Sequence, residues 1–95
     1  MLSNKKIEQL IHLPDLQFVR YCEETYCVNR GIYNIIDAWF YDQNMINVSS
    51  RRKIIIAFFS YLNKDTQKIK FGPGGVKAHL ENFWNFKKDS QIESA

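Results

Sequence analysis

The sequence has no apolar run that approaches the roughly 20 residues of a membrane-spanning helix. Its first residues are also too polar for the apolar core of a secretory signal, because Lys5 and Lys6 are followed by Ile7, Glu8 and Gln9. We therefore expect a cytoplasmic protein without membrane contact. The glycosylation sequon at residues 47–49 is then fortuitous.

Cysteine and histidine are too few, and wrongly spaced, for a metal site or a disulfide. Cys22 and Cys27 are five residues apart, which on one helix places them about 140° apart around the axis, so they cannot bridge each other there. His12 and His79 do not combine with them at any zinc-site spacing. We expect free thiols in a reducing compartment, no metal and no cofactor.

Catalytic arrangements are also lacking. Glu23 and Glu24 are adjacent, so on a helix they diverge instead of converging on one substrate. Cys22 falls on an apolar stripe and has no histidine at a spacing that indicates a nucleophile pair. His79 lies on the apolar side of the last expected helix, where packing is its expected role. We predict no catalytic residue and expect that the protein is not an enzyme.

What the sequence does contain is enough apolar material for one globular domain, at 45% of 95 residues. Its most apolar stretch predicts a central helix from Ser50 to Leu62, with Ser49 or Ser50 as N-cap. A buried strand is the alternative, but a run of about a dozen residues exceeds the usual strand. The apolar sector of this helix comprises Ile54, Ile55, Phe58, Phe59 and Leu62. Only Ile56 falls on the polar side.

Start and stop signals predict two helices before residue 30. Ser3 is a suitable N-cap for a short first helix, which Pro14 ends. Asp15 is a suitable N-cap for a second helix that runs to about Asn29. Gly31 is then expected to end or interrupt this segment, since glycine readily adopts the left-handed conformation after a helix.

The remaining patterns complete a helical bundle. Periodicity predicts a third helix at about 32–42 and a last helix at about 76–86, while residues 68–71 alternate like a short extended segment. Gly72-Pro73-Gly74-Gly75 is the strongest breaker in the chain. We predict an all-α, compact bundle of four to five helices in a single domain of residues 1–88, with a Gly-rich loop before the last helix and a frayed tail at 89–95.

Aromatic residues are unusually frequent, with 7 Phe, 5 Tyr and 2 Trp. One small core does not readily hide so many rings, so part of them is expected at an interface. The first hypothesis is therefore a non-enzymatic regulatory or adaptor module that binds protein, as a homodimer. Trp39, Tyr41 and Trp84 are its expected contact residues, because Trp and Tyr tend to anchor interfaces.

Positive charge supports the alternative hypothesis, a nucleic-acid or phosphate-binding protein, since the formal net charge is +3. The Gly-rich loop at the start of the last helix offers free amides to an anion. The rival interpretations are a simple tight turn and scattered, solvated cations. The expected basic face and loop comprise Arg51, Arg52, Lys68, Lys70, Gly74, Gly75 and Lys77.

Two known phosphate and nucleic-acid motifs do not match. A P-loop needs its lysine directly after the second glycine, followed by Ser or Thr, whereas Val76 precedes Lys77 here and Ala78 follows it. In a helix-turn-helix with Gly31 in the turn, the reading helix would span residues 32–42. That segment contains no Lys or Arg, which speaks against sequence-specific reading of a duplex.

Overall fold

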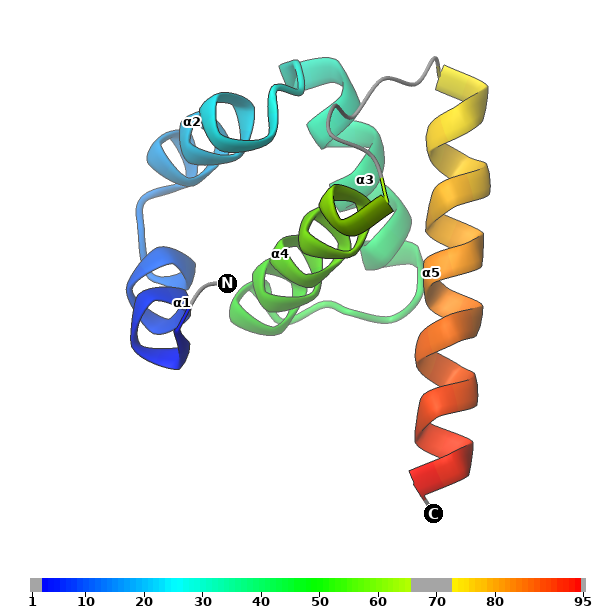
Figure 1. Cartoon of the computed structure of the whole chain (residues 1–95). Coiled ribbons are helices and arrows are strands. Elements are labelled where there is room, and N and C mark those ends of the chain that lie inside the picture. Colours follow the sequence, from blue (N-terminus) through cyan, green and yellow to red (C-terminus); the bar gives the residue numbers. More distant parts are fainter. Residues whose placement is uncertain (1–2, 66–72, 95) are drawn as a thin grey trace.

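The chain folds into five helices, which confirms the predicted all-α bundle (Figure 1). The computed structural model describes the backbone of residues 3–65 and 73–94, and the side chains of residues 3–62 and 75–88. No strand occurs in these residues, and none of their helices is long and apolar enough to cross a membrane. The helices are α1 (Asn4–Ile11), α2 (Asp15–Tyr26), α3 (Arg30–Asp42), α4 (Val48–Asp65) and α5 (Pro73–Ser94).

Short polar side chains fix where three of the helices begin. Ser3 Oγ accepts a hydrogen bond from the Lys6 amide at 3.2 Å, as the sequence predicted. The side-chain oxygen of Asn29 does the same for α3. Asn47 Oδ1 accepts from the Ser50 amide at 2.9 Å, so α4 begins at Val48. The prediction of a serine N-cap for α4 was wrong, because Asn47 accepts from the Ser50 amide and both serines lie within the helix.

The boundary between α2 and α3 also differs from the prediction. α2 begins at Asp15 with Pro14 at the N-cap and no side-chain cap, and it ends at Tyr26. The left-handed residue after it is Cys27, with φ of 55°, not Gly31. Gly31 lies in the first turn of α3 without positive φ, because the cap at Asn29 starts that helix before the glycine.

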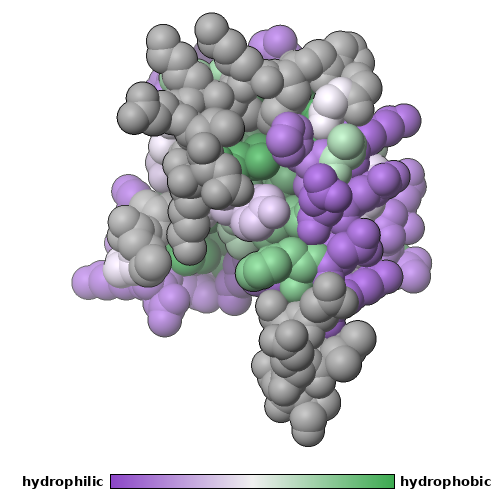
Figure 2. All heavy atoms as spheres, turned by 45° about the vertical axis from the view of Figure 1, so that its right-hand side comes forward, coloured by the Kyte–Doolittle hydropathy of each residue, from purple (hydrophilic) through white to green (hydrophobic). Residues whose placement is uncertain are grey.

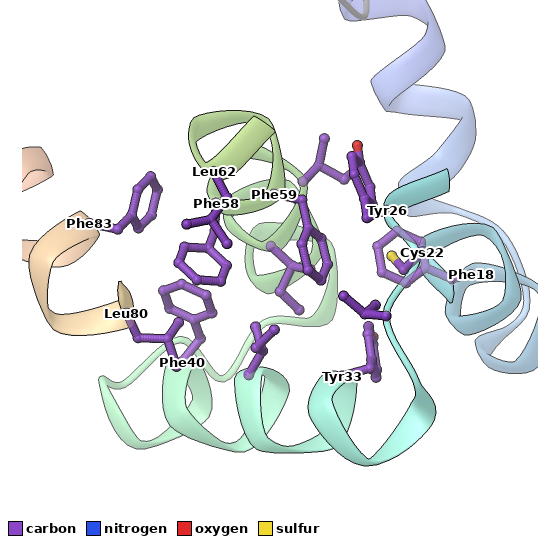
Figure 3. Packing of buried hydrophobic residues seen from close by; sticks show 14 of the residues in the cluster. Phe18, Cys22, Tyr26, Tyr33, Phe40, Phe58, Phe59, Leu62, Leu80 and Phe83 are labelled. Carbon is purple, nitrogen blue, oxygen red and sulfur yellow. The ribbon is translucent and has the colours of Figure 1, made fainter. Parts of the chain in front are cut away.

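α4 is the centre of the bundle, as the apolar run predicted. It packs against α1, α3 and α5. Figure 3 shows its two flanks: Phe58 points toward Phe40 and Phe83, while Phe59 points toward Tyr26 and α2. Ile56, expected on the polar side, is 2% exposed. It is covered because α1 packs against α4, so α4 is buried over a wider arc than one apolar stripe.

α5 packs against α3 and α4 and projects past the rest of the bundle at its C-terminal end (Figure 1). Pro73, Gly74 and Gly75 form its first turn instead of a loop before it, which suits proline because the first helical position needs no amide hydrogen. The helix continues to Ser94, past the expected end near Phe86 and through most of the segment expected to fray. The predicted extended segment at 68–71 lies outside the described residues.

Candidate functional site

Charge is divided unevenly along the chain. Residues 15–42, which form α2 and α3, contain five acidic and two basic residues, a net of −3. Residues 43–95, which include α4 and α5, contain nine basic and four acidic residues, a net of +5. α2 and α5 lie on opposite sides of the bundle (Figure 1). The positive surplus lies in residues 43–72, because α5 itself contains three basic and three acidic residues.

Arg52, expected on the basic face, instead lies inside the protein. It is 7% exposed, and its Nη1 donates to the carbonyl oxygens of Ile11 at 3.0 Å and Leu13 at 2.6 Å. Its Nη2 donates to the Asp15 carboxylate, and its guanidinium lies over the Phe18 ring, 4.7 Å from the centroid. These contacts use the guanidinium to join α4 to the connector between α1 and α2.

Arg51, the preceding residue of α4, is also engaged by groups within the protein. Its Nε donates to Asp37 at 2.8 Å, and its Nη1 donates to the carbonyl oxygens of Met45 at 2.9 Å and Ile46 at 3.1 Å. The guanidinium also lies 5.4 Å from the centroid of the Tyr41 ring. Arg51 therefore holds the connector between α3 and α4, and we leave both arginines out of the candidate anion-binding surface.

A polar pocket of about 220 Å³ opens beside these two arginines, between α2, α3 and the start of α4. Two carboxylates balance the two guanidinium groups, so the pocket does not attract a phosphate. Burial raises the pKa of the Tyr33 hydroxyl in its wall, so this group stays neutral. The lining residues are Asp15, Val19, Tyr33, Asp37, Val48, Arg51 and Arg52.

The lysines of α5 are placed differently, because they reach solvent. Lys77 and Lys88 are exposed and Lys87 is half-buried. None of the three forms an ion pair with a carboxylate among the described side chains. Lys87 Nζ lies 5.8 Å from the Phe83 ring centroid, and Lys88 Nζ lies 6.0 Å from that of Trp84. The structure thus keeps one predicted cation, Lys77, at a free surface and adds two that sequence reasoning did not select.

The Gly-rich segment contributes the N-terminal turn of the same helix. Gly74 and Gly75 both lie in this turn, and Gly75 is exposed two residues before Lys77. Amides in a first helical turn lack partners within the helix, so they favour anions. Lys68 and Lys70, the other predicted members of this site, lie outside the described residues.

Large aromatic rings accompany these cations on both flanks of α5. Trp84 meets Trp39 of α3 with their ring centroids 5.9 Å apart, and both side chains are half-buried against the core. On the other flank, Phe86 is 55% exposed and lies 5.7 Å from the ring of Tyr61 on α4. Tyr41, 51% exposed, lies apart from them, beside Arg51. Figure 2, which brings α5 forward, shows hydrophobic atoms exposed next to a broad hydrophilic band.

The thiols and imidazoles form no centre of their own. Cys22 is fully buried, and burial raises its thiol pKa to about 12, so it is a poor nucleophile. Cys27 is exposed. His12 lies 3.7 Å from Glu8, and His79 is half-buried on α5. Among the residues that the structure describes, no three His, Cys, Asp or Glu side chains are grouped closely enough to hold a metal ion.

Comparison with known proteins gives one informative similarity. The chain is similar to the RNA-binding riboflavin kinase RibR of Bacillus subtilis (strain 168). The two are 42% identical over 92 residues, covering 87% of this chain and 40% of the relative. The chain therefore spans two fifths of the relative's length. No family model matches the chain, and neither does any solved structure.

This similarity corrects two predictions made from the sequence. The protein-binding adaptor was the wrong choice of function, because the relative is named for binding RNA. The contacts at Trp39, Tyr41 and Trp84 stay a prediction. The aromatic surplus that favoured the adaptor mostly fills the core. The expectation that the protein is not an enzyme is wrong on the same comparison, since the relative is also named as a kinase. That activity is a property of the whole relative, of which the chain matches 40%.

Proposed function

We propose that this chain is an RNA-binding module. The observation that carries the proposal is the 42% identity with a relative named as RNA-binding, which extends over 87% of the chain. The charge distribution supports it, because the half that contains α4 and α5 has a net charge of +5. RNA presents a phosphate on every nucleotide, so a surface with exposed lysines is the expected electrostatic counterpart.

α5 provides the contact surface. Its exposed Lys77 and Lys88 are separated by 11 residues, or about 16 Å along a helix, so each reaches a different phosphate of one strand. Lys87 lies beside Lys88, and the amides of Gly74 and Gly75 lie at the N-terminal end.

The test is RNA affinity as a function of salt. Fluorescence anisotropy of a labelled single-stranded RNA is measured between 50 and 200 mM salt, with wild-type protein and with the double variant Lys77→Ala/Lys88→Ala. Each phosphate contact to a single strand contributes roughly 0.7 to the slope of log affinity against log salt. Removal of two contacts therefore lowers this slope by about 1.4 and weakens binding at low salt.

The double variant Lys5→Ala/Lys6→Ala is the matched control. Both lysines are exposed on α1, away from α5. The control variant therefore loses the same number of positive charges as the α5 variant. It is expected to keep a slope close to that of the wild type. Equal loss in both variants would show that only net charge matters and would remove α5 as the surface. Absence of RNA binding by the wild type at 50 mM salt would refute the proposed function itself.

A further inference from the structure

Phe86 is a large apolar side chain on the proposed RNA-binding helix that the core leaves uncovered. It is 55% exposed, whereas Phe83, one turn earlier on α5, is 2% exposed. The difference follows from position, because Phe83 points toward α4 and the two residues are separated by about 60° around the helix axis. The Phe86 side chain is therefore accessible to a partner, whose contact would remove apolar surface from water.

The ring is held in place by a neighbour. Tyr61, half-buried near the C-terminal end of α4, lies 5.7 Å from Phe86 at an interplanar angle of 36°. Tyr61 is itself anchored to the core by the Phe83 ring, at 5.4 Å. Tyr61 and Phe86 therefore form an aromatic platform. The buried Phe83 ring packs against Tyr61 and holds this platform on the core.

Positive charge lies next to this platform. Lys87 follows Phe86 directly, and its Nζ lies 5.8 Å from the centroid of Phe83, the ring that supports Tyr61. No described carboxylate pairs with Lys87. An aromatic face beside a free cation is complementary to a nucleotide, whose base stacks while its phosphate meets the charge.

We propose that the Tyr61–Phe86 platform stacks an unpaired RNA base, so that the module binds single-stranded or looped RNA in preference to a duplex. This inference rests on the proposed RNA-binding function and specifies its substrate class. Bases in a duplex are stacked on each other and do not expose their faces, whereas unpaired bases stack on aromatic side chains. An unpaired nucleotide therefore fits this site, because its base can stack on the Phe86 ring while its phosphate meets Lys87.

The experiment compares two labelled RNAs of equal length, one single-stranded and one a duplex, by anisotropy at fixed low salt. The proteins are the wild type, Phe86→Ala, Phe86→Tyr and Leu16→Ala. Loss of one base–aromatic stack weakens binding roughly 5- to 150-fold, so Phe86→Ala is expected to lose affinity in that range for the single strand only. Phe86→Tyr keeps a ring and is expected to retain the affinity.

Leu16→Ala is the matched control, because Leu16 is 51% exposed and lies on α2 in the acidic half of the chain. It is expected to bind both RNAs like the wild type. If Phe86→Ala binds the single strand as the wild type does, or weakens both RNAs equally, the inference fails while the proposed function stands. If the wild type binds neither RNA, the proposed function fails first.

A further measurement separates RNA stacking from self-association. Sedimentation of wild type and Phe86→Ala without RNA is expected to give the same mass for both. A dimer that Phe86→Ala converts to a monomer would show that a second copy of the chain covers the ring, and would overturn the inference.

Discussion

The guanidinium of Arg52 on α4 donates to the carboxylate of Asp15, 37 residues earlier at the start of α2. The partners differ in environment, since Arg52 is 7% exposed and the Asp15 side chain is 96% exposed. The same guanidinium also donates to the carbonyl oxygens of Ile11 and Leu13. One buried cation thus holds the connector between α1 and α2 against the central helix.

Replacement of Arg52 by alanine is expected to destabilise the fold by about 3 kcal/mol or more, because it leaves carbonyl groups of the connector without their donor. Urea unfolding followed by circular dichroism measures this loss. Asp15→Asn is the control and is expected to cost much less, since that side chain is almost fully solvated. A loss below about 1 kcal/mol for Arg52→Ala would contradict the structural role.

The cap of α4 gives a second prediction. Asn47→Ala removes the side-chain oxygen that accepts from the Ser50 amide and is expected to cost about 1 kcal/mol of unfolding free energy. Ser49→Ala and Ser50→Ala, at the positions that the sequence favoured, are expected to change it by only a few tenths. The three variants compared in one denaturation series decide which residue caps the helix.

The fold was largely predictable because its main signals are local. The run from Ile54 to Leu62 has helical periodicity whatever surrounds it, and Ser3 meets an amide three residues away. The role of Arg52 was not predictable in this way, because its carbonyl partners lie about 40 residues earlier in the chain. A basic residue at a helix start has the same sequence signature whether it faces water or a connector.

The candidate site was predicted only in part for a related reason. Lys77 was found because it follows the glycines, a pattern within one segment. Helical periodicity places Phe86 near the apolar residues of the last helix, so the sequence pattern alone does not mark it as exposed. The exposure of Phe86 depends on which part of the α5 surface is covered by α4, and this is defined only by the packing of the two helices.

The core around Phe40 provides a third prediction. This ring is fully buried between α3, α4 and α5 and meets Phe58 at 6.1 Å and Phe83 at 6.2 Å. Phe40→Ala is expected to cost about 3–5 kcal/mol, as for other large-to-small core changes. Phe86→Ala, which removes a ring of the same size from the surface, is expected to cost far less. Similar losses from both would show that Phe86 belongs to the core.

Alkaline pH tests the burial of Cys22. Its thiol pKa is raised to about 12 in the folded protein, mainly because burial disfavours the thiolate, whereas a thiol in the unfolded chain titrates near 8.5. Above about pH 8.5 the unfolded state therefore binds fewer protons than the folded state. The stabilisation from the neutral thiol is complete below that pH and is lost progressively as pH rises toward 12.

The urea midpoint of the wild type is accordingly expected to fall between pH 8.5 and 10, before most tyrosines and lysines titrate. Cys22→Ala lowers stability overall but should flatten this part of the profile, because the titrating thiol is gone. Cys27→Ala, which removes an exposed thiol, is the matched control variant. Parallel slopes for wild type and Cys22→Ala would mean that Cys22 is accessible in the folded protein, contrary to its full burial.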